Sequence, residues 1–152
     1  MSETTAAAAV ESVANVLDRE RKPLIADWLE RVEEVPDLPR IPLNREERMG
    51  HLTHDVTARV RLDTEANATI SESAGHHGEL RNKQGYTVEM LIEESRLLQV
   101  CIFTILHENV KYLDFNLLLP DIVTIADEVD AQLRQQMHCY KVANIAKIAK
   151  AN

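Results

Sequence analysis

Residues 74–86, AGHHGELRNKQGY, separate two segments of helical pattern and indicate a helical hairpin. The stretch holds two adjacent histidines and three of the chain's four glycines, with almost no apolar side chains. Gly85 is well placed to end the first helix in a left-handed cap. Steps of three and four put one set of residues on the side that faces the core: Ile70, Ala74, His77, Gly78, Arg81 and Gln84. The remaining sides hold Glu72, His76, Glu79, Asn82 and Lys83.

The second helix of the hairpin carries a carboxylate where an apolar residue is expected. Its stripe runs Leu91, Glu94, Leu98, Cys101, Ile105. A buried, unpaired carboxylate costs several kcal/mol and therefore needs a partner or a proton. In antiparallel helices Glu94 is matched by Arg81. We predict a buried or half-buried polar cluster of His77, Arg81 and Glu94, with Gln84 or Tyr86 as further members.

Two small residues accompany this cluster on the core side. Ala74 and Gly78 allow a neighbouring backbone to approach closely, although a glycine inside a helix costs roughly 1 kcal/mol. Two interpretations of the cluster stay open. It is a structural network that fixes helix register, or it is a site that senses a signal or binds a ligand.

The rest of the chain is also helical. A first helical region covers residues 6–35 and is interrupted at Pro23, which either kinks one helix or starts a second. A proline-rich loop follows, and then a helix from Asn44 to about Arg61. Its inner face is predicted to be Met49, Leu52, Val56 and Val60. Thr69 and Glu72 have the spacing of a capping box before the hairpin. The apolar helix after Thr87 is expected to end near Leu113.

These patterns predict an all-α protein, a helical bundle of five or six helices forming one domain over residues 1–152. A globin-like packing is the alternative. No alternating strand pattern is present. The composition agrees, with 45% hydrophobic but only 4% aromatic residues.

Charge and hydropathy limit the classes of function. The net charge of −8 argues against nucleic-acid and anionic-membrane binding. No apolar run reaches the roughly 18 residues that a membrane span needs, and the N-terminus lacks a signal-peptide pattern. We therefore expect a cytoplasmic protein with two reduced cysteines, Cys101 and Cys139.

A long last helix is predicted over residues 116–150. Its apolar stripe, Ile122, Ala126, Val129, Leu133 and Tyr140, has the spacing of a two-helix seam. Gln136 interrupts that seam. Residues 87–133 carry a net charge of −7, whereas residues 134–152 carry +4. We expect a signalling helix that pairs with its copy in a homodimer; the plainer interpretation is that the basic end stabilises the helix dipole.

The run HHGELRNKQGYTVEMLIEESRLL resembles the N-terminal domain of RsbRD-type RsbT co-antagonist proteins, a domain also found at the front of bacterial sensor histidine kinases. The resemblance rests on His77, Gly78, Arg81, Gln84, Gly85, Glu94, Leu97 and Leu98. The upstream run LIADWLERVEE, with Trp28, is similar to the family's early tryptophan helix. The similarity covers residues 13–140.

The resemblance implies a non-catalytic sensor or input domain of a bacterial signal-transduction protein, either a histidine kinase or a stress-response regulator. Such domains precede an output domain, and this chain carries no kinase motif. It is therefore expected to be an isolated input domain, relaying a signal to an output domain or a partner protein. The competing class is a protein–protein interaction module with no small-molecule ligand.

Metal, haem and enzyme alternatives are weaker. His51 and His54 lie three residues apart, but the Glu-x-x-His pattern of di-iron bundles is absent. His107 is the best haem-ligand candidate, in a chain poor in aromatic residues. Cys101 lies in an apolar stripe, as an inert thiol does. We therefore expect no cofactor, no metal site and no catalytic residue.

Overall fold

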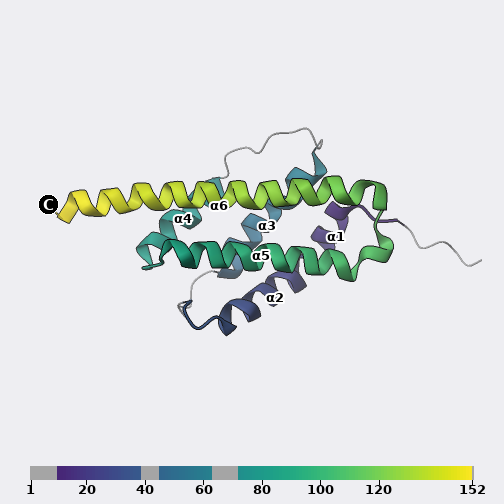
Figure 1. The fold of residues 1–152 in the computed structure, drawn as a ribbon, viewed down its shortest axis with the longest axis horizontal. Helices are drawn as coiled ribbons and strands as arrows, with labels where there is room; N and C mark the ends of the chain where they lie inside the picture. The colour runs from purple at the N-terminus through teal and green to yellow at the C-terminus, as the bar shows by residue number, and fades with distance from the viewer. Residues whose placement is uncertain (1–9, 39–44, 63–71, 152) are drawn as a thin grey trace, which may run out of the picture.

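The protein is an all-α bundle, as predicted. This computed structural model describes residues 10–38, 45–62 and 72–151. Within those ranges the chain forms six α-helices, a short 3-10 helix and no strand. They are α1 (Val13–Arg19), α2 (Arg21–Glu34), α3 (Arg45–Arg61), α4 (Glu72–Lys83), α5 (Val88–Glu108), η1 (Val110–Tyr112) and α6 (Phe115–Ala151). Helices α5 and α6 run antiparallel, and the C-terminal end of α6 extends beyond the other helices (Figure 1).

The first helical region divides into two helices at Glu20. Ser12 caps α1 by accepting a hydrogen bond from the Asn15 backbone N–H at 3.2 Å. Pro23 lies in the first turn of α2. Proline is tolerated there because a backbone N–H in the first turn has no carbonyl of the same helix to bond. The predicted caps at Asn44 and Thr69, the position Ile70 and residues 6–9 lie outside the described residues.

The core lies mainly between α1, α2, α3 and α5, and α6 adds Ile125 and Val129 to it. All four inner-face positions predicted for α3 are buried, and the stripe predicted for α5 is buried too, including Glu94. Trp28 of α2 is the largest fully buried side chain of this core. A buried aromatic side chain of that size contributes a large share of the stabilisation of the core around it.

Helix α5 ends earlier than predicted, at Glu108 rather than near Leu113. Asn109 is its C-cap, and the side-chain Nδ2 of Asn109 donates to the Ile105 carbonyl at 2.8 Å. The Asn109 backbone N–H donates to the same carbonyl and to the Leu106 carbonyl, both at 3.2 Å. The chain then turns through η1, where the Tyr112 carbonyl accepts from the Glu11 backbone N–H at 2.7 Å.

Helix α6 presents a different inward face from the predicted stripe. Of the five stripe residues only Val129 is buried. The buried positions are Thr124, Ile125, Glu128, Val129, Gln132 and Gln136. Polar groups are tolerated there because they are bonded. Gln132 Nε2 donates to the Leu52 carbonyl at 3.0 Å, and Glu128 pairs with Arg59 at 3.2 Å.

The turn between α4 and α5 is a Schellman motif. The Tyr86 N–H donates to the Arg81 carbonyl at 3.0 Å, and the Gly85 N–H donates to the Asn82 carbonyl at 3.1 Å. Gly85 has φ of 78°, as the left-handed cap requires. At the other side of the turn, Thr87 caps α5 by accepting from the Met90 N–H at 3.3 Å.

Gly85→Ala is expected to destabilise the protein by about 1–2 kcal/mol, the usual cost of an L-residue in this conformation. No atom lies within 4 Å of the added Cβ, so the effect is conformational rather than steric. Urea unfolding followed by circular dichroism measures it. Gly85→Asn is the control and should lose less, because asparagine tolerates positive φ. Equal losses in both variants would contradict the explanation.

Candidate functional site

The predicted polar cluster lies inside the hairpin. His77 and Arg81 project from α4 and Glu94 projects from α5, and each residue is only 1% exposed. Arg81 Nη2 lies 2.8 Å from Glu94 Oε2. The register of the Schellman turn sets this match, since it brings the last turn of α4 beside the second turn of α5. Arg81 and Glu94 therefore form a fully buried ion pair.

The Arg81 guanidinium is held on two further sides. Its Nη1 donates to Gln84 Oε1 at 2.7 Å. Its Cζ lies 4.5 Å from the centroid of the Tyr86 ring, within the range of a cation–π contact. Both residues were predicted as further members of the cluster, and the structure places both against Arg81. The guanidinium is thus fixed by a carboxylate, an amide and an aromatic face.

Tyr86 ties the cluster to two other helices. Its hydroxyl accepts from Arg45 Nη2 of α3 at 2.9 Å, and its carbonyl accepts from the Tyr140 hydroxyl of α6 at 2.6 Å. Burial raises the pKa of Tyr86, and the Glu94 carboxylate adds to that effect. The phenol is therefore neutral at physiological pH. It joins α3, α6 and the hairpin in one network.

The backbone of Glu94 is also engaged. Its carbonyl accepts from Trp28 Nε1 at 3.1 Å, a bond to an already bonded helical carbonyl that links α2 to the cluster. The sequence pattern placed Trp28 in the apolar repeat of the first helical region and in the family resemblance, but did not connect it with the cluster. Arg45 was not predicted as a member of the cluster, and Asn82 was predicted to lie on an outward side of its helix. The only feature of the sequence that pointed to Arg45 was its position at the start of a predicted helix.

His77 is the most buried histidine of the described chain. Its Nε2 lies 3.8 Å from Glu94 Oε1, which is too long for one, and neither ring nitrogen has a partner among the described residues. Burial lowers the pKa of His77 below its ordinary value. The Glu94 carboxylate opposes this shift, and the charges of Arg81 and Arg48 add to it. His77 is therefore neutral near pH 7.

The cluster contains more buried polar atoms than it satisfies. Besides the two His77 nitrogens, three atoms lack a hydrogen-bond partner among the described residues: Arg81 Nε, Gln84 Nε2 and Glu94 Oε1. Each such atom costs about 1–3 kcal/mol, and more when it is charged. Donors and acceptors thus converge in one place, which is the composition of a site for a small polar species.

The stability of the protein is expected to fall as the pH decreases from about 7.5 to about 5.5. Because the folded-state pKa of His77 is lowered, the unfolded chain binds the proton more readily below the ordinary value of 6.5. The contribution is fully present above that value and is lost on acidification. Urea unfolding at both pH values measures it. His77→Gln should show a smaller pH difference; an unchanged difference would contradict the assignment.

Helix α4 packs on α6 through main chain. A Cβ added at Gly78 would lie 2.0 Å from the Gln136 carbonyl oxygen, so only glycine fits there. Ala74, one turn earlier, has no exposed surface. The close approach predicted at Gly78 agrees with this contact, whereas for Ala74 the structure shows burial alone.

Asn82 is buried, although the sequence pattern predicted that it lies on an outward side of α4. It is 2% exposed, because Nδ2 donates to the Tyr140 carbonyl at 3.1 Å and its own carbonyl accepts from Lys147 Nζ at 2.8 Å. His76, by contrast, is exposed as predicted. Helix α4 therefore buries two faces, one toward α5 and the other toward α6.

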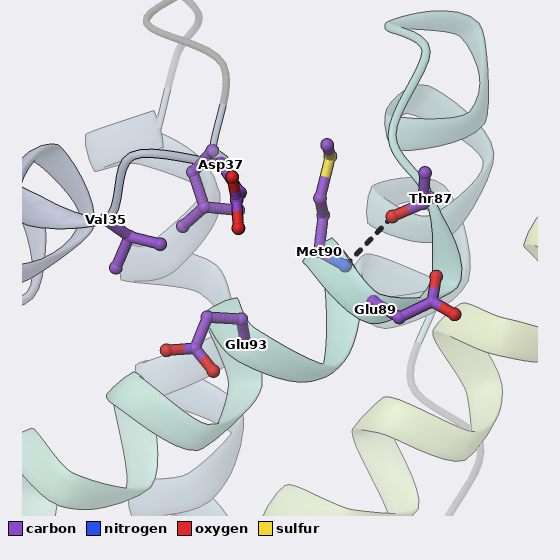
Figure 2. A pocket seen from close by; sticks show the side chains of 7 residues that line it. Val35, Asp37, Thr87, Glu89, Met90 and Glu93 are labelled. Atoms are coloured by element: carbon purple, nitrogen blue, oxygen red, sulfur yellow. Dashed lines mark hydrogen bonds between the residues drawn. The ribbon is translucent and has the colours of Figure 1, made fainter.

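A separate surface hollow of about 580 Å³ lies where α5 begins. Figure 2 shows Val35 and Asp37, from the segment after α2, opposite Met90 and Glu93 of α5. Its remaining lining residues are Leu38, Thr87 and Glu89. Glu93 is paired with Arg96 at 2.7 Å. The hollow thus combines apolar walls with carboxylates and is distinct from the buried cluster.

The histidines weighed as ligands do not converge. His51, His54 and His107 are exposed, and the described residues contain no group of three potential ligands placed to hold a metal ion. An exposed His107 is not enclosed by the apolar pocket that haem requires. Burial raises the pKa of the Cys101 thiol to about 12, which makes it a poor nucleophile. Among the described helices, none is long and apolar enough to span a membrane.

Comparisons with protein-family models, with curated proteins and with solved structures give no match for this chain. The contacts of the cluster and the sequence resemblance are therefore the basis for a functional proposal.

Proposed function

We propose that this chain is a non-catalytic input domain of a bacterial signal-transduction protein. It works in the cytoplasm as a homodimer and relays a signal through helix packing to an output domain or a partner signalling protein. The resemblance to RsbRD-type N-terminal domains supports this proposal at the residues that build the cluster, namely His77, Gly78, Arg81, Gln84, Gly85 and Glu94.

The observation that carries the proposal is a buried charged cluster in main-chain contact with α6. Arg81 and Glu94 are each 1% exposed, yet Arg81 Nε and Glu94 Oε1 have no hydrogen-bond partner among the described residues. A small polar or ionic ligand, or a proton, changes the energy of such a group far more than that of an exposed one. Titratable groups that burial and a charge partner perturb strongly are enriched at functional sites.

The contact between Gly78 and Gln136 provides the relay. Any shift of α4 against α5 must also move α6, because main-chain atoms in contact leave no side chain to absorb the movement. The bonds from Asn82 and Tyr86 to Tyr140 extend that coupling along α6. A ligand that prefers one packing of the cluster would therefore shift the population of α6 positions.

A thermal-shift screen of small polar metabolites, inorganic anions and metal ions tests this function. We expect at least one compound to raise the melting temperature, and Arg81→Ala to abolish the effect. Arg96→Ala, which removes an exposed arginine on α5, is the matched control and should retain it. Hydrogen exchange should then show altered protection in α6. A screen without any hit, together with a partner protein recovered by pull-down, would reject the sensing role.

The second candidate is an interaction module that senses nothing small. The hollow between the segment after α2 and the start of α5 favours it, because its carboxylates and apolar walls suit a basic, partly apolar peptide. Glu89→Lys should then weaken capture of a partner at least tenfold. Glu79→Lys, an exposed charge reversal on α4, should leave capture unchanged. Equal effects of both changes would reject this surface.

A further inference from the structure

The outward face of α6 is apolar at both ends, and no other described residue buries it. Near its start, Phe115, Leu119 and Val123 are 71%, 71% and 68% exposed, at steps of four residues. Near its end, Ile145 and Ile148 are 64% and 58% exposed. All five positions fall on one side of a helix with 3.6 residues per turn. Large apolar side chains gathered on one face indicate an interaction surface.

Between these ends lies a shallow hollow of about 420 Å³. It is lined by the apolar Leu133 and Met137 and by the polar residues Asp130, Arg134, His138 and Lys141. Leu133 is the middle residue of the 37-residue helix. The outward face thus has an apolar patch at each end and a hollow with apolar and charged lining at its centre.

The charges of α6 are segregated about the same midpoint. The half before Leu133 carries four acids and no base, Asp121, Asp127, Glu128 and Asp130. The half after it carries four bases and no acid, Arg134, Lys141, Lys147 and Lys150. Glu128 is buried and pairs with Arg59, so the exposed acids of the first half are Asp127 and Asp130. Laid antiparallel on a copy of itself, the helix sets these two acids against the exposed Arg134 and Lys141 of the other copy. A parallel pair would instead set like charges together.

We propose that two copies of this chain pair antiparallel through the outward faces of α6, with the twofold axis at Leu133. Leu119 of one copy then lies within a turn of Ile145 and Ile148 of the other, and Asp130 lies within a turn of Arg134. The inference rests on the proposed homodimer and specifies its surface and orientation. Because the contact is isologous, every charge pair occurs twice.

The length of α6 provides enough area. A helix of 37 residues is about 55 Å long, so a strip about 10 Å wide on each copy buries on the order of 1,100 Å² in total. That value is at the lower end for specific interfaces, so we expect a dimer that dissociates on dilution and in salt. Helix α4 contacts α6 at Gln136, beside the axis, so the two polar clusters would be coupled across it.

Analytical ultracentrifugation of the full chain tests the surface. Arg134→Glu with Lys141→Glu should weaken dimerisation at least tenfold, because it places two acids opposite the acidic half. Both residues are exposed and make no ion pair within the described part of the chain. Lys22→Glu with Lys111→Glu changes the net charge equally on other exposed positions and should leave the dimer intact. A monomeric wild type would reject the homodimer itself, and equal weakening by both pairs would reject this surface.

Spin-label distances test the orientation, with Cys139→Ser as background because Cys139 is partly exposed. A label at Leu133→Cys should give a distance below about 20 Å. A label at Leu119→Cys should give roughly 40 Å, because antiparallel helices separate by about 1.5 Å per residue on each side of the axis. Short distances at both positions would show a parallel dimer and reject the antiparallel arrangement, but they would agree with the proposed homodimer. Long distances at both would reject the surface.

Discussion

Glu94→Leu is expected to destabilise the protein by about 3–5 kcal/mol, because it leaves the Arg81 guanidinium buried without its counter-ion. Arg81 is 1% exposed and its Nη2 lies 2.8 Å from Glu94 Oε2. Gln84 and Tyr86 remain in contact with it, but neither carries the opposite charge. Arg81→Met should cost a similar amount, since it strands the carboxylate. Urea unfolding at neutral pH measures both losses.

Glu94→Leu combined with Arg81→Met should recover part of that loss. The double variant replaces the pair by apolar groups, and such a replacement of a buried ion pair often costs little folding stability. The matched control is the neighbouring exposed pair, Glu93 with Arg96, whose side chains are 30% and 58% exposed. Glu93→Leu should cost no more than about 1 kcal/mol. Additive losses in the double variant, or a neutral Glu94→Leu, would contradict a buried, coupled pair.

Gly78→Ala is expected to destabilise the protein by about 3 kcal/mol or more, at or above the upper end for overpacked cores. The new Cβ would lie 2.0 Å from the Gln136 carbonyl oxygen, so α4 and α6 must separate. The Gln136 carbonyl belongs to the backbone of α6 and cannot rotate away as the end of a long side chain can. This loss would outweigh the roughly 1 kcal/mol that alanine gains over glycine inside a helix. Thermal unfolding and urea unfolding both report it.

Gly50→Ala is the control for that substitution. Gly50 also lies inside a helix, but the nearest atom to an added Cβ is Ile25 Cδ1 at 3.9 Å, an ordinary contact. The change should leave stability unchanged or raise it by up to about 1 kcal/mol. A Gly78→Ala variant as stable as Gly50→Ala would show that α4 and α6 do not touch through main chain.

Local patterns were sufficient for the hairpin. A glycine placed after a helical pattern predicted the left-handed cap, and Thr87 predicted the next N-terminus, because both depend on neighbouring residues only. A glutamate in an apolar stripe and an arginine on the facing side predicted their pairing, since a buried charge has few alternatives. The end of α5 was not predictable in the same way. The apolar pattern continues past Glu108, yet Asn109 is the C-cap and the chain turns there into a 3-10 helix.

By itself the sequence determined the helices, the turn that joins α4 to α5, and the pairing of Arg81 with Glu94. These follow from periodicity, capping and the cost of an unpaired charge, which act over a few turns of chain. Only the tertiary structure decided which face of α6 is buried, why Asn82 points inward and why Trp28 contacts Glu94. Those contacts join segments more than 50 residues apart in the sequence. Their hydrogen bonds allow polar side chains to be buried at positions where a hydrophobic pattern predicts exposure.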